Sequence, residues 1–316
     1  MTGTLHALLH QSLDYAGLFP PASLSMAQAT ATFADSRHEG AAALVSRFVC
    51  PAPRLAELAT FLTALPVPVR VAAILRGGKS AGECLANLET ELAALATRSS
   101  ASDAIAVDTL ELRLPPDALE GPALRKLLAA ILALLSRQPG AARQVFLEIA
   151  PSPVLLDQLG QVAESADRLR EAAPITLGYK LRTGGSDASS VPSLALVAAA
   201  LAAAHAHRLP MKCTGGLHHP VRGKYAGADH ALHGFINLLT AAALAHHHQA
   251  AAAELEAVLA EEHPLAFVFG PETLQWGSRS LPVAALTAAR DQFLTSFGSC
   301  FTDIPRTELR RMGWWE

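Results

Sequence analysis

Residues 175–181 read ITLGYKL, residues 193–207 read SLALVAAALAAAHAH, and residues 209–213 read LPMKC. The first and last segments are short runs typical of strands, and the alanine-rich segment between them is long enough for a helix. A strand, a helix and a second strand in this order predict a βαβ unit, in which the strands lie parallel and the helix covers the sheet.

The same alternation runs along the whole chain. Strands are predicted at residues 15–20, 43–49, 69–75, 109–114, 144–149, 175–181, 209–213 and 265–269. Helices are predicted at residues 26–37, 53–65, 80–97, 123–137, 153–171, 193–207, 233–247, 251–262 and 283–296.

Eight such units in 316 residues, without a break in composition, predict one domain, residues 1–316, of the α/β class. The expected architecture is a (β/α)8 TIM barrel with a long loop after strand seven, residues 215–232, and an extra C-terminal segment. A doubly wound sheet is the alternative. No G-x-G-x-x-G or P-loop sequence follows the early strands, which weakens that alternative.

The composition excludes several classes of protein. Hydrophobic residues make up 51% and charged residues 17%, which excludes intrinsic disorder. The net charge is −3 and the pI is about 6.5, so no basic field favours nucleic acid. No apolar run has the length of a membrane span, no signal peptide is evident, and the four scattered cysteines suit a reducing cytoplasm. A small-molecule substrate is the expected partner, with self-association into a homo-oligomer left open.

Charged residues interrupt strands that a barrel would bury. Leu110, Leu112 and Leu114 share one face of their strand, whereas Glu111 and Arg113 share the other. The other charged residues near strand ends are Arg47, Glu148, Lys180, Arg182 and Lys212. Burying charge is costly unless it is paired, and barrel enzymes build their sites at the carboxyl ends of the strands. We therefore expect Glu111, Glu148, Lys180, Arg182 and Lys212 to converge in one cavity. The alternative is an ion-pair network that only packs the barrel.

Two of only five lysines end neighbouring strands, because Lys180 and Lys212 lie 32 residues, or one βα unit, apart. Each is followed by a Thr-Gly-Gly sequence: Thr183, Gly184 and Gly185 after the first, and Thr214, Gly215 and Gly216 after the second. Glycines allow backbone N–H groups to approach a ligand and form a nest for phosphate or carboxylate. These residues are therefore expected to bind substrate.

The two motifs resemble the signatures of deoxyribose-phosphate aldolase and its class I aldolase relatives, K-x-x-T-G on strand six and K-x-S-G-G-I on strand seven. The matching residues are Lys180, Thr183 and Gly184, then Lys212, Thr214, Gly215, Gly216 and Leu217. The resemblance implies a lyase that acts, without a cofactor or metal, on a small carbonyl compound with an anionic group. It also implies that Lys180 forms the Schiff base and that Lys212 perturbs it and assists proton transfer.

The chain departs from that family at two places. No aspartate is evident on a middle strand, so Glu111 or Glu148 is expected to act as the acid and base. The Gly-Ser run that binds phosphate after strand eight in the family is missing at Phe269-Gly270-Pro271, and Phe297-Gly298-Ser299-Cys300 lies further downstream.

A nucleophilic lysine needs a lowered pKa. A second cation ~6 Å away at an effective dielectric of ~20 costs roughly 3 kcal/mol, or ~2 pKa units. Lys212 and Arg182 are therefore expected to lower the pKa of Lys180, while Arg47, Arg113 and Arg182 bind the anionic group of the substrate. The alternative is a non-catalytic barrel in which the two lysines bind an anion.

Polar residues also follow strand seven, and His218, His219, His233 and Asn237 are expected at the barrel mouth. Histidine and carboxylate ligands can hold a divalent metal ion. A metal-dependent lyase or isomerase is therefore a further alternative, although no HExxH spacing is present. Asp14 could also reach the mouth, and residues 297–305 are expected to fold back as a lid.

Overall fold

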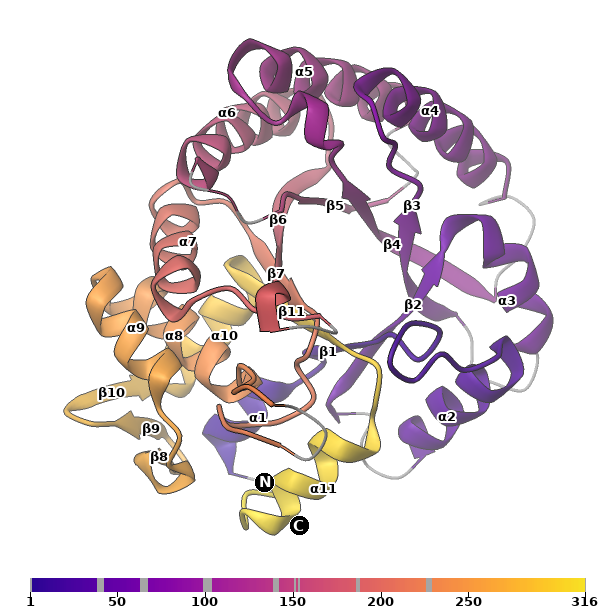
Figure 1. Ribbon diagram of the computed structural model, residues 1–316. Helices are drawn as coiled ribbons and strands as arrows, with labels where there is room; N and C mark the ends of the chain where they lie inside the picture. Colours follow the sequence, from indigo (N-terminus) through magenta and orange to yellow (C-terminus); the bar gives the residue numbers. More distant parts are fainter. Residues whose placement is uncertain are drawn as a thin grey trace.

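Eight parallel strands close into a barrel in the computed structural model of this chain, in the order β1-β11-β7-β6-β5-β4-β3-β2 (Figure 1). The structure describes residues 2–38, 43–62, 68–98, 104–138, 142–150, 152, 154–185, 188–225 and 229–315. Helices surround the strands, as Figure 1 shows in a view along the barrel. The predicted (β/α)8 TIM barrel is confirmed.

The barrel strands are β1 Leu13–Tyr15, β2 Val45–Pro51, β3 Val69–Leu75, β4 Ile105–Arg113, β5 Gln144–Glu148, β6 Thr176–Arg182, β7 Met211–Thr214 and β11 Leu294–Ser299. The α-helices are α1 Gly3–Leu9, α2 Met26–His38, α3 Leu55–Phe61, α4 Ala81–Arg98, α5 Gly121–Arg137, α6 Leu155–Ala172, α7 Leu194–Ala206, α8 Phe235–His248, α9 Ala252–Ala260, α10 Val283–Gln292 and α11 Asp303–Arg311. A small antiparallel sheet contains β8 Phe267–Phe269, β9 Thr273–Trp276 and β10 Arg279–Pro282.

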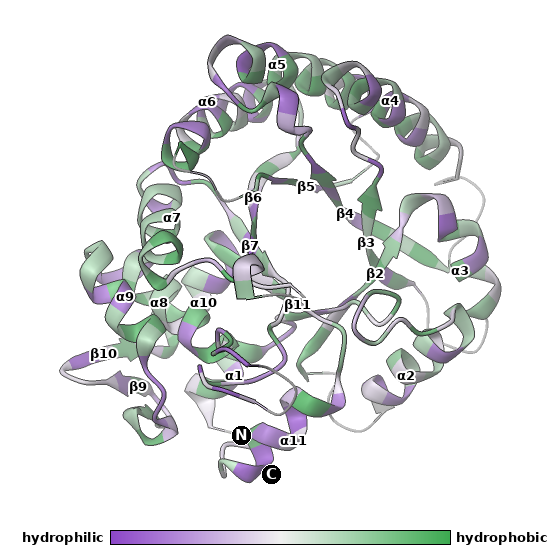
Figure 2. Cartoon of the chain, in the orientation of Figure 1, coloured by the Kyte–Doolittle hydropathy of each residue, from purple (hydrophilic) through white to green (hydrophobic). Residues whose placement is uncertain are grey.

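The core lies between the strands and the surrounding helices. Leu110, Leu112, Leu147 and Leu181 are completely buried. On the helix side, α5 buries a stripe of residues spaced three or four apart: Leu124, Leu127, Leu128, Ile131 and Leu135. Figure 2 shows the result as helices that carry both hydrophobic and hydrophilic residues. Because the leucines pack outward against helices, the charged residues that alternate with them are left to face the barrel interior.

The first and last barrel strands differ from the predictions. The first strand is β1, which ends at Tyr15 where a strand over residues 15–20 was expected. Residues 265–269 belong mainly to β8, outside the barrel, and the eighth barrel strand is β11, which pairs with β1 and β7. The predicted helix over residues 283–296 ends at Gln292. The reason is that β11 carries inward serines, so it lacks the apolar pattern by which a buried strand is recognised.

The segment Ala188–Ala206, which contains α7, is apolar and long enough to cross a membrane by length and composition alone. In this structure α7 packs against α6, α8 and α9 as part of the helical layer, and Val197, Ala200 and Leu201 are completely buried. Its composition therefore fits a helix that covers the barrel.

The position of β11 can be tested by truncation of Phe297, which is 1% exposed and stacks on Phe235 at a ring separation of 4.7 Å. We expect Phe297→Ala to lower the free energy of unfolding by about 3–5 kcal/mol. Leu265 is 88% exposed, so Leu265→Ala should change it by less than about 0.5 kcal/mol. Urea unfolding of both variants is the measurement, and a larger loss in Leu265→Ala would contradict this assignment.

Candidate active site

A cavity of about 1150 Å³ opens at the carboxyl ends of the barrel strands. Lys180, Lys212 and Glu111 lie at its buried end. Its walls come from the loops after β1, β6 and β7, and from α11 at the C-terminal end of the chain. This is where TIM-barrel enzymes place their active sites.

The two lysines lie side by side, since Lys180 of β6 is in register with Lys212 of β7, and Glu148 of β5 is in register with Lys180. The Lys180 ammonium contacts Glu111 Oε2 at 2.6 Å and Glu148 Oε2 at 2.8 Å. Glu111 Oε1 contacts the Lys212 ammonium, so Glu111 bridges the two amines. Glu111, Lys180, Arg182 and Lys212 line the cavity, and Glu148 reaches this cluster through its contact with Lys180.

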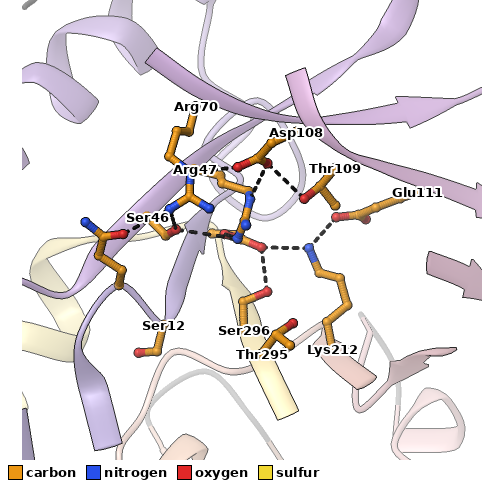
Figure 3. A network of polar contacts seen from close by, with 12 residues as sticks. Ser12, Ser46, Arg47, Arg70, Asp108, Thr109, Glu111, Lys212, Thr295 and Ser296 are labelled. Atoms are coloured by element: carbon orange, nitrogen blue, oxygen red, sulfur yellow. Dashed lines mark hydrogen bonds and ion pairs between the residues drawn. The ribbon is translucent and has the colours of Figure 1, made fainter. Parts of the chain in front are cut away.

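A second carboxylate, Asp14, holds the other side of Lys212. Its Oδ2 atom lies 2.7 Å from Lys212 Nζ and accepts a hydrogen bond from Ser296 Oγ at 2.7 Å. Its Oδ1 atom lies 3.4 Å from Arg47 Nη1. Arg47 Nε in turn donates to Asp108 Oδ1 at 2.6 Å, as Figure 3 shows. Asp14 is thus completely buried in the barrel interior, with Lys212 and Arg47 as partners.

Two carboxylates of this cluster, Glu111 and Asp14, are ionised. Burial raises the pKa of Glu111, but Lys180 and Lys212 more than offset it and hold the pKa at about 2. Burial likewise raises the pKa of Asp14, and Lys212 and Arg47 bring it down to about 2. Both groups are therefore charged across the physiological pH range.

The prediction that neighbouring cations lower the pKa of Lys180 is wrong for this resting arrangement. Burial does lower the pKa of Lys180, but the charges of Glu111 and Glu148 outweigh that effect and raise it. Lys180 is therefore an ammonium group when the cavity holds no substrate. The neighbouring cations do not decide this pKa, because each amine lies between two carboxylates: Glu111 and Glu148 for Lys180, and Glu111 and Asp14 for Lys212.

The glycine-rich loops after β6 and β7 are joined to each other. Thr183 donates its backbone N–H to Thr214 O at 2.7 Å and its Oγ1–H to Gly215 O at 2.9 Å. Gly215 has φ +88°, and a Cβ atom at this position would lie 2.4 Å from Gly184 O. Gly216 also has a positive φ, +73°. Only glycine allows this approach, which brings both loops to one wall of the cavity.

The predicted histidines divide into two groups. His218 and His219 line the cavity, where His218 Nδ1 lies 3.0 Å from Ser299 Oγ and His219 Nδ1 lies 2.8 Å from Glu308 of α11. Burial, followed by the charge of His219, lowers the pKa of His218 to about 4, so His218 is neutral.

His233 and Asn237 do not line the cavity, which corrects their predicted place at the barrel mouth. His233 Nε2 lies 2.9 Å from Pro192 O. Asn237 Nδ2 donates to Val258 O and Glu261 O at 2.8 Å, so it ties α8 to α9. His233 lies just before α8 and Asn237 lies within it, and in both residues a side-chain nitrogen bonds to backbone carbonyl oxygens.

The predicted arginines also lie in different places. Arg182 is exposed and lines the cavity. Gly185 also lines the cavity. Arg113 is 70% exposed and lies over a separate groove of about 330 Å³ beside Gly77 and Gly78, with Nε 4.0 Å from Glu148 Oε1. Arg47 is buried below the cavity in ion pairs with Asp14 and Asp108. Arg47 and Arg113 do not line the cavity, because one is held by carboxylates and the other extends from the strand end into solvent.

Within the described part of the chain, no three His, Cys, Asp or Glu side chains are grouped so that they could hold a metal ion. Glu111 and Glu148, the carboxylates of the metal-dependent alternative, both contact Lys180.

Sequence reasoning missed several residues of the site. Asp108 lies just before the strand that was predicted at residues 109–114, whereas β4 begins at Ile105 and includes it. Ser296 lies on the strand that was predicted as helix. Glu308 and Arg311 belong to α11, which lines the cavity and overlaps the end of the lid predicted for residues 297–305, although both residues lie after that range. The many charged residues of this last segment were the available signal.

The buried carboxylates predict a loss of stability in acid. In the unfolded chain Asp and Glu titrate near ~3.9 and ~4.3, whereas Asp14 and Glu111 titrate at about 2 in the fold. The unfolded state therefore binds more protons as the pH falls from about 5 towards 2, and each carboxylate contributes a slope of up to ~1.4 kcal/mol per pH unit. Urea unfolding between pH 2.5 and 7 should show a shallower slope for Glu111→Gln. Glu89→Gln, on the exposed side of α4, should keep the wild-type slope. Equal slopes in all three proteins would contradict the ionised pairing of Glu111.

No model of a known protein family matches the chain, and no curated protein matches it significantly. The function is therefore argued from the geometry of the barrel mouth, in which two paired lysines and their carboxylates lie at the end of a large cavity.

Proposed function

We propose that this protein is a lyase of the class I aldolase type, which acts on a carbonyl compound through a Schiff base on Lys180. One observation carries the proposal: two lysine amines from adjacent strands lie at the inner end of a cavity of about 1150 Å³, bridged by Glu111. A network that only packed the barrel would have no need of a cavity over its amines.

Lys180 is the better placed of the two amines. It is 6% exposed, whereas Lys212 is 1% exposed and lies between Asp14 and Glu111. Glu111 and Glu148 lie 2.6 and 2.8 Å from Lys180 Nζ, which is within reach for direct proton transfer. Transfer of a proton to one of these carboxylates, when substrate displaces water, produces the neutral amine that the chemistry requires.

The reaction then follows from the groups present. The Lys180 nitrogen forms a bond to the carbonyl carbon. The former carbonyl oxygen takes up two protons, one from the Lys180 nitrogen and one from the carboxylic acid that accepted the ammonium proton, and leaves as water, which gives a protonated imine. Glu148 or Glu111 removes the proton of the substrate β-hydroxyl, the Cα–Cβ bond breaks, and its electron pair moves towards the imine nitrogen. An aldehyde leaves, the resulting enamine takes up a proton, and water releases the second product and restores Lys180. Lys212 lies beside this centre, in contact with Asp14 and Glu111.

An anionic group on the substrate is supported by the corrected position of the eighth strand. Gly298 and Ser299 end β11, so the Gly-Ser sequence that seemed too far downstream stands at the carboxyl end of barrel strand eight. Ser299 contacts His218, and Gly298 packs against Thr214, next to Gly215. The glycine backbone of these loops and the cavity-lining guanidinium of Arg182 are suited to a phosphate or carboxylate.

Borohydride trapping tests the covalent step. We expect the wild-type protein, incubated with a panel of small aldehydes, ketones and 2-keto acids and reduced with borohydride, to gain mass on the peptide that contains Lys180. Lys180→Arg keeps the charge but cannot form an imine, so trapping and turnover should fall by at least about 10³-fold. Lys126→Arg, on the exposed face of α5, is the matched control and should behave as wild type.

The same experiment separates the alternatives. Tight binding of anions without any lysine adduct would favour an anion-binding barrel. Turnover that survives in Lys180→Arg and is abolished by a chelator would favour the metal-dependent lyase or isomerase. Either result would exclude the Schiff-base mechanism.

A further inference from the structure

The ion pairs of the site continue below the cavity as one chain of alternating charge. Starting at the mouth, its members are Glu148, Lys180, Glu111, Lys212, Asp14, Arg47, Asp108 and Arg70, and each contacts the next. Arg70 lies near the start of β3 and is 40% exposed, at the opposite end of the barrel from the cavity. Its Nη1 donates to Gln11 Oε1 at 2.9 Å. Figure 3 shows the part of this chain from Arg70 to Glu111.

Three barrel strands are irregular where they contribute to this chain. The register between β3 and β4 shifts so that Asp108 is skipped, between pairs Val71–Val107 and Ala72–Thr109. The register between β1 and β2 shifts across Ser46 and Arg47, and that between β11 and β7 shifts across Thr295. An extra residue in a strand redirects the neighbouring side chains. Asp108 can therefore reach Arg47 and Arg70 from a position that regular alternation would turn towards the helices.

The longest contact in this chain of ion pairs is the one between Arg47 Nη1 and Asp14 Oδ1, at 3.4 Å. Arg47 is held away by Asp108, which accepts from its Nε at 2.6 Å, from Arg70 Nε at 2.7 Å and from Thr109 Oγ1 at 2.9 Å. Asp14 is therefore left to bind Lys212 at 2.7 Å. If Arg47 paired more closely with Asp14, Asp14 would bind Lys212 less strongly. Lys212 would then have Glu111 as its main ion-pair partner, and Glu111 would bind Lys180 less strongly.

We propose that Asp108 is a positioning residue for the amine at the mouth: by retaining Arg47 it keeps Asp14 on Lys212 and leaves Glu111 to share its charge with Lys180. The catalytic consequence rests on the proposed function, but the coupling itself is a property of the resting protein. Asp108 touches neither amine, and it acts through Arg47 and Asp14.

The sign of the coupling follows from the charges that surround Lys180. Glu111 faces it from β4, Glu148 from β5 and Lys212 from β7, and Arg182 lies on its own strand. Arg290 of α10 acts on Asp14 from outside the barrel. The charges of these groups stay the same when Asp108 is neutralised, but Arg47 is then free to pair with Asp14, so Lys212 depends more on Glu111 and less negative charge is left for Lys180, which favours the neutral amine. Loss of the positive charge of Arg70 has the opposite effect.

The test measures the reactivity of Lys180 directly, without a natural substrate. Formaldehyde with cyanoborohydride methylates neutral amines, and mass spectrometry follows the peptide that contains Lys180, one of only five lysines, between pH 7 and 9.5. We expect Asp108→Asn to methylate Lys180 about 3- to 10-fold faster than wild type. This factor corresponds to a fall of about 0.5 to 1 unit in the pKa of Lys180. Arg70→Gln should methylate it more slowly by a similar factor.

Two further proteins distinguish charge from loosening of the fold. In the double variant Asp108→Asn with Arg70→Gln, Arg70 has already lost the carboxylate through which it acts, so the rate should equal that of Asp108→Asn, whereas two independent structural defects would add. Asp167→Asn removes the same charge from an exposed ion pair with Arg170 on α6 and should leave the rate unchanged.

Opposite shifts in the two single variants, with the double variant at the rate of Asp108→Asn, would support the proposal. Unchanged rates in folded Asp108→Asn and Arg70→Gln, or a double variant that differs from Asp108→Asn in either direction, would overturn it. If Asp108→Asn fails to fold, Arg70→Gln decides by itself, since a slower rate supports the coupling and an unchanged rate rejects it. Failure of the trapping experiment with carbonyl compounds would reject the proposed function without affecting this result.

Discussion

The bridge that Glu111 makes between Lys180 and Lys212 is the interaction on which the rest of the site depends. Two ammonium groups on adjacent strands in register repel each other, and burying either one alone is strongly unfavourable. A carboxylate that places one oxygen on each amine offsets both the repulsion between the two ammonium groups and the cost of burying their charges. Since Glu111 is 3% exposed, its own charge is tolerable only while both lysines remain in place. The two lysines and this carboxylate are therefore one unit, and no member can be replaced independently of the other two.

Two further carboxylates, one on each side of this unit, pair with the lysines. Glu148 supplies the second carboxylate of Lys180, and Asp14 supplies that of Lys212. The interior of the barrel can be charged because every described member has a partner of opposite sign within 4.0 Å. Such pairing adds little net stability compared with an apolar filling of similar volume. In the proposed function its value lies in chemistry, because it places proton acceptors next to an amine at the end of the cavity.

Much of the fold and the centre of the site could be predicted from the sequence. The alternation of leucine with charge on β4 to β7 was sufficient to turn Glu111, Lys180 and Lys212 inward, because side chains on a regular strand alternate strictly. Asp108 was overlooked because the strand was predicted to begin at residue 109, and Arg47 was expected at the mouth because it lies near the end of the strand predicted at residues 43–49. The eighth strand was missed because Ser296 of β11 binds Asp14 and Ser299 contacts His218, so the strand lacks an apolar signature. The raised pKa of Lys180 could not be predicted, because it depends on the distances from Lys180 to Glu111 and Glu148, which the sequence alone does not give.

The pairing of β1 with β11 also determines when the barrel can close during synthesis of the chain. Leu13 pairs with Phe297, so the two edges that complete the cylinder are almost the whole chain apart. Asp14 emerges from the ribosome early, but Lys212 and Ser296 emerge only much later. Until then its carboxylate has Arg47 as its only ion-pair partner in this cluster, and an open sheet keeps it hydrated at no cost. Nascent chains should therefore remain as an open sheet with exposed edges, and acquire a dry interior in one late step.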